Sequence, residues 1–202
     1  MTRLPFGFTS AALRRRRPPS TVVFDVETVR GPEECGGWGH VDRFGLAIAV
    51  SWCAAHGYRS WDEARAGALV GYLGRFERIV GFNVLRFDYA VLSAYQPDLW
   101  PWLVPRTLDL LADVHRLLGF RVSLDRLAAA TLDAHKSGSG AESLRWWREG
   151  ARTRVLRYCR DDVRLTRDLY HHGRDRGVIR YPDGEAVRPL RVSWRRPGSA
   201  SP

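Results

Sequence analysis

Thr21-Val22-Val23-Phe24-Asp25-Val26-Glu27-Thr28 is the stretch from which the rest of the chain can be interpreted. Its apolar first half predicts a buried strand over residues 21–26. Asp25 and Glu27 occupy alternate positions, and alternate residues of a strand face the same side. Two neighbouring carboxylates repel each other and are unfavourable to bury, and a divalent metal ion is the commonest partner that offsets this. The stretch therefore predicts a metal site at the end of a core strand.

The size and composition of the chain predict one globular domain. The chain has 202 residues and is 45% hydrophobic, which is enough for one buried core and short for two domains. We expect an irregular basic leader over residues 1–20, one domain over residues 21–195 and a tail over residues 196–202. No apolar run is long enough to span a bilayer, so no membrane contact and a cytoplasmic location are expected. The three cysteines are widely spaced, which argues against a disulfide framework and a Cys-x-x-Cys zinc site.

The charge of the chain is strongly positive. The formal net charge is +10, and Lys136 is the only lysine among 32 basic residues. A basic protein attracts polyanions such as nucleic acids, while local acids hold metal. A GC-rich genome also enriches arginine, so the charge alone supports nucleic-acid binding only modestly.

Hydrophobic periodicity predicts an α/β protein with a mixed sheet covered by helices. Strands are expected at 44–53, 56–61 and 78–82, after a Gly-rich loop at 29–43. Helices are expected at 62–76, 88–94, 141–149 and 151–171, and in the strand-to-helix segment 107–118. A further helix is expected after its cap at Ser123. Pro97 and Pro101 are expected to break the chain, residues 136–140 to form a Ser/Gly loop, and residues from 175 onward to form a hairpin with its turn at 182–184.

Two further groups of residues supply candidate ligands. Asn83 follows a short apolar strand and Asp88 begins a helix, where an aspartate also serves as a simple cap. Tyr158 and Asp162 are four apart in the longest predicted helix and therefore share a face. The alternative for Asp162 is a solvated acid paired with Arg154 or Arg157. Asp161 is the better candidate for that surface role.

Taken together, these residues resemble the three motifs of the DEDD superfamily of 3′–5′ exonucleases, in its tyrosine subclass (DEDDy). The matching positions are Asp25 and Glu27; Asn83, Phe87 and Asp88; and Tyr158 and Asp162. The chain looks closest to small predicted exonucleases related to the proofreading domain of family B DNA polymerases, a bacterial group often linked to helicases. The resemblance covers most of residues 21–195 and implies a ribonuclease H-like fold.

The resemblance implies a two-metal reaction with two Mg²⁺ or Mn²⁺ ions about 4 Å apart. It implies that Asp25 bridges the ions, that Glu27 and Asp162 hold the ion that carries the nucleophilic water, and that Asp88 binds the second. Tyr158 would orient that water or help to deprotonate it. The expected substrate is the 3′ end of single-stranded nucleic acid, DNA favoured and RNA possible, which is hydrolysed to nucleoside monophosphates. The alternatives are a nucleic-acid-binding accessory module of a helicase or repair complex, and a structure-specific endonuclease.

Four residues are candidates for substrate binding. Trp38 lies in the Gly-rich loop and would stack on the terminal base, unless it packs under the loop as core. Asn83 and Thr28 flank the acids and would contact the terminal sugar or phosphate, although Asn83 also suits a turn. Lys136 survives as lysine in an arginine-rich chain, which either reflects a need for a compact ammonium at a phosphate or is chance.

Overall fold

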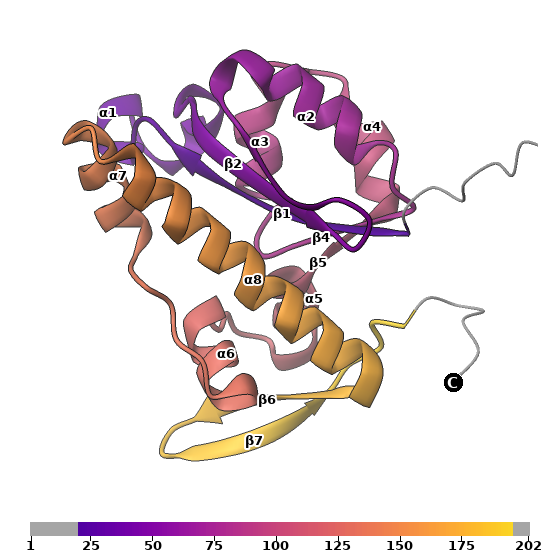
Figure 1. The fold of residues 1–202 in the computed structure, drawn as a ribbon. Helices are drawn as coiled ribbons and strands as arrows, with labels where there is room; N and C mark the ends of the chain where they lie inside the picture. Colours follow the sequence, from indigo (N-terminus) through magenta and orange to yellow (C-terminus); the bar gives the residue numbers. More distant parts are fainter. Residues whose placement is uncertain (1–19, 196–202) are drawn as a thin grey trace, which may run out of the picture.

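The computed structural model describes residues 20–195 and places a mixed five-stranded sheet at the centre (Figure 1). The strand order is β3-β2-β1-β4-β5, with bounds Thr21–Thr28 (β1), Leu46–Cys53 (β2), Gly57–Trp61 (β3), Arg78–Gly81 (β4) and Thr107–Asp109 (β5). The predicted α/β class with a mixed sheet flanked by helices is confirmed. Residues 1–19 of the expected leader (1–20) and the whole expected tail (196–202) lie outside the described residues. Within residues 20–195, no helix has the length and apolarity that a membrane span requires.

β1 lies in the middle of the sheet and extends past its parallel neighbour. It runs antiparallel to β2 and parallel to β4, and its pairing with β4 covers only residues 21–23. Asp25 and Glu27 pair with β2 on one side, and the register shifts after Glu27. On the other side they lie beyond the last β4 pair, at the carboxyl ends of the parallel strands. This is the edge at which open α/β sheets bind their ligands.

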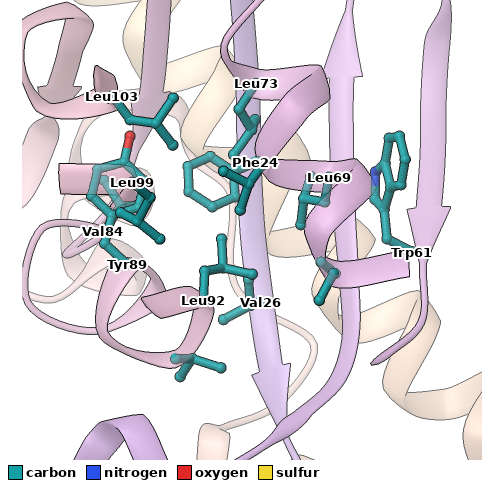
Figure 2. Close-up of a cluster of buried hydrophobic side chains, with 14 of the residues drawn as sticks. Phe24, Val26, Trp61, Leu69, Leu73, Val84, Tyr89, Leu92, Leu99 and Leu103 are labelled. Atoms are coloured by element: carbon teal, nitrogen blue, oxygen red, sulfur yellow. The ribbon is translucent and has the colours of Figure 1, made fainter. Parts of the chain in front are cut away.

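Alternate side chains of β1 pack into two different hydrophobic cores, one on each face of the sheet. Val22, Phe24 and Val26 face α2 (Ala66–Leu73), α3 (Asp88–Ser93) and α4 (Leu99–Leu103), and this cluster is shown in Figure 2. Val23 faces the opposite core, which is built by α5 (Leu110–Leu118), α6 (Leu124–Leu132) and α8 (Arg152–Arg176). Asp25 and Glu27 follow Val23 at every second position. They therefore share one face of the sheet, as the sequence predicted, and this is the face covered by α8.

The Gly-rich segment 29–43 is not the plain loop that was expected. It contains α1 (Pro32–Cys35) and the 3₁₀ helix η1 (Trp38–Arg43). Pro32 occupies the first turn of α1, the Glu34 side chain accepts from the Gly31 N–H, and Gly36 ends the helix with φ +84°. Proline at the start and a left-handed glycine at the end define a short helix. In the sequence, the glycines and the proline of this segment had predicted a loop.

Other boundaries also differ from the expected ones. The helix expected at 62–76 divides into η2 (Glu63–Arg65) and α2. Pro97 lies in the turn between α3 and α4, as expected, whereas Pro101 lies inside α4, in its first turn, where its missing N–H leaves no bond unmade. Leu99 and Leu103 of α4 are fully buried. A third 3₁₀ helix, η3 (Val104–Arg106), leads into β5.

The last third of the chain follows the expectation more closely. Ser123 caps α6 as predicted, and α7 covers Gly140–Arg148. α8 continues to Arg176, beyond the expected end at His171, and Gly177 ends it in the left-handed conformation. β6 (Val178–Asp183) and β7 (Ala186–Arg191) form the predicted hairpin beside α6. Trp194 then returns to the helix layer, where it is buried and donates to Asp113 at 2.8 Å.

We expect Gly173→Ala to destabilise the protein by about 1–3 kcal/mol, the range for overpacking a core. A Cβ at this position would lie 2.3 Å from Cε3 of Trp194, so the indole would have to move. Gly67→Ala is the matched control, since a Cβ there meets no heavy atom within 4 Å. Alanine in an open helical position should be neutral or stabilising. Urea unfolding of both variants checks this, and equal stability of the Gly173 variant and the wild type would refute the packing argument.

Candidate functional site

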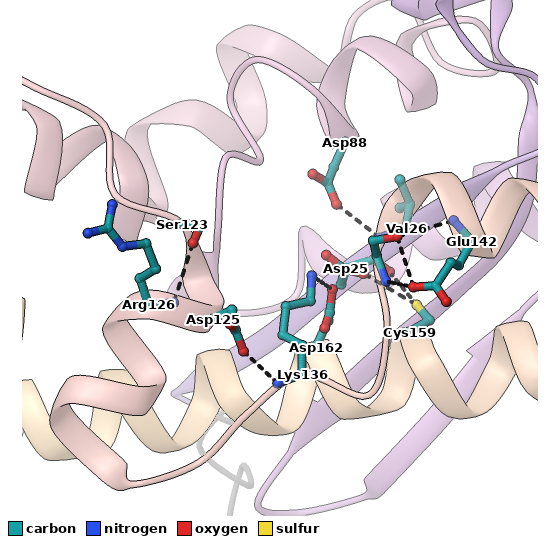
Figure 3. A network of polar contacts seen from close by, with 11 residues as sticks. Asp25, Val26, Asp88, Ser123, Asp125, Arg126, Lys136, Glu142, Cys159 and Asp162 are labelled. Atoms are coloured by element: carbon teal, nitrogen blue, oxygen red, sulfur yellow. Dashed lines mark hydrogen bonds and ion pairs between the residues drawn. The ribbon is translucent and has the colours of Figure 1, made fainter. Parts of the chain in front are cut away.

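Four carboxylates from three elements converge at the carboxyl end of β1. Asp25 and Glu27 come from β1, Asp88 from the start of α3 and Asp162 from the middle of α8. Figure 3 shows Asp25, Asp88 and Asp162 directed toward the same region. Glu27, Asp88 and Asp162 are buried, with 8%, 2% and 5% exposure. Two adjoining cavities of about 510 and 470 Å³ meet here, and both are lined by Asp25 and Asp162.

Asp88 faces the sheet and does not act as a helix cap. Its Oδ1 accepts a hydrogen bond from the backbone N–H of Val26 at 3.0 Å, and no side-chain cap is formed at the start of α3. Val26 lies just past the end of the β1–β4 pairing. The carboxylate of Asp88 thus takes the place of a strand partner, which fixes it next to Asp25.

Asn83 forms the turn that delivers Asp88 to the site. Its φ is +68°, a strained value for a residue other than glycine. The Asp109 carboxylate holds this turn, because it accepts from the Asn83 N–H at 2.8 Å and from the Leu85 N–H at 3.0 Å. Asp109 also caps α5, where its side chain accepts from the backbone N–H groups of Leu111 and Ala112. The Asn83 side chain lines the larger cavity and accepts from Arg121 at 2.9 Å.

Lys136 lies inside the acid cluster. Its Nζ is 2.5 Å from Asp162 Oδ2 and 4.9 Å from the centre of the Tyr158 ring. Its backbone N–H donates to Asp125 Oδ1 at 2.8 Å, which anchors the loop between α6 and α7 (Figure 3). The side chain lines both cavities. The only lysine of the sequence is therefore placed at the carboxylates.

α8 presents Tyr158 and Asp162 to the site from one face. Tyr158 is 2% exposed and packs edge-on against Trp146, with ring centres 6.0 Å apart. Asp162 pairs with Lys136, and its Oδ1 is buried without a hydrogen-bond partner among the described residues. The alternative pairing of Asp162 with Arg154 or Arg157 is not formed. Asp161 instead forms the surface ion pair, in which its Oδ1 lies 3.6 Å from Arg164 Nε.

The electrostatics of the cluster disfavour negative charge in the protein alone. Burial, and then the charge of Asp162, raises the pKa of Asp25 to about 8. Burial, and then the charge of Asp25, raises the pKa values of Glu27 and Asp88 well above their usual range. Burial alone would lower the pKa of Lys136, but Asp162 and the other acids raise it overall. These shifts are those of carboxylates held close together without enough positive charge.

The donor set fits divalent cations. Asp25, Glu27 and Cys159 each offer one ligand atom, and these atoms lie within 4.8 Å of one another. Asp88 and Asp162 add further oxygens around the same cavities. Oxygen ligands are those that Mg²⁺ and Mn²⁺ prefer. A bound cation would also offset the repulsion that raises the pKa values of the acids.

The smaller cavity has an apolar wall beside the acids, formed by Pro32, Trp38, Phe44, Phe87 and Leu144. Trp38 is 69% exposed, so it does not pack under its loop as core. Its ring lies 5.9 Å from that of Phe44. Thr28 also lines this cavity, but its hydroxyl donates to the Arg30 carbonyl at 2.9 Å. The Thr28 hydroxyl therefore donates its proton within the protein, and only its oxygen is left to accept from a ligand.

Two residues of the site were not identified from the sequence. Cys159 directs Sγ at Asp25, 3.4 Å from its carbonyl oxygen and 3.5 Å from Oδ2. Arg121 reaches Asn83 from the segment before α6. Cys159 could have been found from its spacing to Asp162, because helix residues three apart lie on the same face. Nothing in the sequence near Arg121 distinguishes it from the other arginines.

Comparisons with known proteins support the fold. No protein-family model matches the sequence, and no curated protein matches it. Among solved structures, the family B DNA polymerase from the hyperthermophilic archaeon Pyrobaculum calidifontis resembles the chain with a TM-score of 0.58 and 20% sequence identity. The match covers 76% of this chain and 24% of the polymerase chain, so the chain spans about a quarter of that protein's length. The shared architecture, a mixed sheet flanked by helices, is consistent with a ribonuclease H-like fold.

Proposed function

We propose that this protein is a metal-dependent 3′–5′ exonuclease of the DEDD tyrosine subclass. The observation that carries the proposal is the convergence of Asp25, Glu27, Asp88 and Asp162, with Tyr158 beside them, at one cavity. Nothing in the fold requires four carboxylates, three of them buried, to gather at one place, and each is unfavourable there without a cation. The likeness to a DNA polymerase chain supports nucleic acid as the substrate and favours DNA over RNA.

The proposed cofactors are two Mg²⁺ or Mn²⁺ ions, held by Asp25, Glu27, Asp88 and Asp162. When bound, they activate the attacking water and stabilise charge on the departing oxygen. Asp25 is the proposed shared ligand, because its carboxylate interacts with Glu27, Asp88 and Asp162. The hydrogen bond from Val26 holds Asp88 in place, and Lys136 holds Asp162. These contacts fix the ligands before substrate arrives.

Tyr158 is the proposed positioning group for the water. Burial, and then the charges of Asp162, Glu27 and Asp25, raises the pKa of its phenol above the usual 10. The hydroxyl therefore stays protonated near neutral pH and can donate a hydrogen bond. Of the two roles considered, orienting the water is supported and deprotonating it is not.

The two cavities suggest how a strand end would lie. The apolar wall with Trp38 is suited to the terminal base, since aromatic rings stack on any base. Asn83 and Arg121 line the other cavity and offer an amide and a positive charge to the sugar–phosphate backbone. Thr28 lines the smaller cavity, and its hydroxyl oxygen would accept a hydrogen bond from the terminal nucleotide. Lys136 lies between the two cavities, where it would meet the phosphate that is cut.

We expect Lys136→Arg to lower turnover by about tenfold or more, although the charge is kept. The Lys136 side chain is only 21% exposed and its ammonium is a compact donor to Asp162, whereas a guanidinium is wider and planar. Single-turnover rates on a labelled oligonucleotide provide the measurement. Arg126→Lys is the control, because Arg126 lies on exposed α6 surface. Unchanged turnover of Lys136→Arg would refute a special role for lysine.

Two other functions share these features. An accessory nucleic-acid-binding module for a helicase or repair complex would bind strands without cutting them, and a structure-specific endonuclease would cut internally. Linear and sealed circular single-stranded DNA of the same sequence, incubated with Mn²⁺, separate the three. The exonuclease proposal expects mononucleotides from the linear strand and an intact circle. Cleavage of the circle, or no cleavage of either strand, would contradict it. A helicase or repair protein remains the proposed cellular partner.

A further inference from the structure

The thiol of Cys159 lies against the proposed metal ligands. Its Sγ is 3.5 Å from Asp25 Oδ2, and Sγ, one Asp25 carboxylate oxygen and one Glu27 carboxylate oxygen all lie within 4.8 Å of one another. Cys159 is fully buried, and α8 packs directly on β1 at this point. The two-metal proposal assigns no role to this sulfur, because Mg²⁺ and Mn²⁺ select oxygen ligands.

The donor set of two carboxylates and one thiol suits zinc. Zn²⁺ binds cysteine sulfur at about 2.3 Å and carboxylate oxygen at about 2.0 Å, usually in a tetrahedron. With these bond lengths, sulfur and oxygen ligands of the same ion are roughly 3.5 Å apart. The separation of Cys159 Sγ and Asp25 Oδ2 already has this value. The Glu27 oxygen lies within 4.8 Å of the ligand atoms of both residues and has to move closer to share the ion.

A second observation points to a ligand at the same place. Asp162 is 5% exposed, and its Oδ1 is buried with no hydrogen-bond partner in residues 20–195. Asp162 lies on α8 one turn after Cys159 and lines the cavity with Asp25 and Glu27. This oxygen lies outside the group of three ligand atoms that are within 4.8 Å of one another, so the Asp162 side chain has to turn toward them to act as a fourth ligand. A buried acceptor without a partner is otherwise unfavourable.

We propose that Asp25, Glu27 and Cys159, with Asp162 as a fourth ligand, form a Zn²⁺ site that overlaps the site of the catalytic ions. The thiol proton passes to solvent as the zinc–sulfur bond forms, with no change in oxidation state. Zn²⁺ held by the sulfur displaces the ions that support hydrolysis, so zinc inhibits the enzyme. The inhibition rests on the proposed nuclease function, but the binding of zinc does not.

The other cysteines supply the controls. Cys53 Sγ lies 3.4 Å from His56 Nδ1 and 3.5 Å from the Tyr72 hydroxyl, so it is a competing place for a soft metal. Cys35 is partly exposed and donates to the Arg43 carbonyl. A double variant, Cys35→Ser with Cys53→Ser, keeps Cys159 as the only described thiol. The single variants Cys159→Ser and Cys159→Ala remove it.

Co²⁺ reports zinc sites because thiolate ligation produces an intense near-ultraviolet charge-transfer band. We expect this band with one equivalent of Co²⁺ in the wild type and in the double variant, and its loss on addition of Zn²⁺. Cys159→Ser and Asp25→Asn should lack it. Circular dichroism confirms that each variant is folded, and Cys159→Ala replaces Cys159→Ser if the serine variant is not. A band that survives removal of Cys159, or no band in the wild type, would overturn the zinc site.

The effect on catalysis is measured separately. We expect the Zn²⁺ concentration for half-inhibition of Mn²⁺-supported hydrolysis to rise about tenfold or more in Cys159→Ser, each protein being compared with its own uninhibited rate. Equal zinc sensitivity of the two proteins would overturn the inhibitory role. A Co²⁺ band in a protein without nuclease activity would instead refute the proposed function and leave the zinc site standing.

Discussion

Asp25→Asn will reduce Mn²⁺-dependent nucleotide release by roughly 10³-fold or more, the scale of losing a central electrostatic element of an active site. Asp25 lies where the other three acids converge, and its carboxylate interacts with each of them. Asparagine keeps the shape of the side chain and removes the negative charge. The expected loss therefore measures metal binding and not packing. Initial rates on a labelled single-stranded oligonucleotide, at saturating Mn²⁺, provide the measurement.

Asp161→Asn is the matched control for this loss. Asp161 is the neighbour of Asp162 on α8, but it points away and forms a surface pair with Arg164 at 3.6 Å. An exposed ion pair of this kind contributes little to stability or to the site. The control should keep the wild-type rate within about twofold. Comparable rates for Asp25→Asn and the wild type would remove Asp25 from the catalytic site.

The same Asp25→Asn substitution will stabilise the metal-free protein, even though it abolishes activity. The folded pKa of Asp25 is raised from the usual 3.8 to about 8, mainly by burial and then by Asp162. A raised acid pKa means that the contribution of this group to stability is fully present below about pH 4 and is lost as the pH rises through about 8. Asparagine does not ionise and avoids that loss. We expect a gain of about 1–3 kcal/mol at pH 8, which is several degrees in Tm for a domain of this size.

Thermal unfolding in EDTA at several pH values tests this prediction. The difference in Tm between Asp25→Asn and the wild type should be smallest near pH 4, should grow as the pH rises toward about 8, and should level off above it. Mn²⁺ should raise the Tm of the wild type, most strongly at the alkaline end, and should raise that of the variant much less. A variant that is less stable than the wild type across this range would show that the carboxylates do not oppose one another in the fold.

The β1 strand shows what alternation in a sequence can establish. Its apolar run and the spacing of Asp25 and Glu27 predicted a core strand with two carboxylates on one face, and both features are present. The period of two in a strand is a local property, so the sequence contains it. The helix face that carries Tyr158 and Asp162 was predictable for the same reason.

Features that depend on tertiary context were predicted less well. Pro101 lies in a helix because Leu99 and Leu103 are buried against the core, and that burial is not visible locally. Cys159 reaches Asp25 only because α8 packs across β1, more than a hundred residues away in sequence. Arg121 meets Asn83 in the same way. Contacts between distant segments are set by packing, which local periodicity does not encode.

Lys136 is an intermediate case. Its rarity in an arginine-rich chain suggested a specific need, but nothing in the Ser/Gly loop predicted its partner. The structure places it at Asp162, anchored through Asp125 at its backbone. Composition thus identified the residue, and only the fold identified the contact.

Digestion of matched single-stranded oligonucleotides that are labelled at the 3′ or the 5′ end tests the exonuclease proposal most directly. DNA and RNA versions are incubated with Mg²⁺, with Mn²⁺ or with EDTA. We predict that the 3′ label is released at once as a mononucleotide, that the 5′-labelled strand shortens in single-nucleotide steps, and that EDTA stops both. Prompt release of the 5′ label, internal cutting, or no metal-dependent shortening of either nucleic acid would contradict the account.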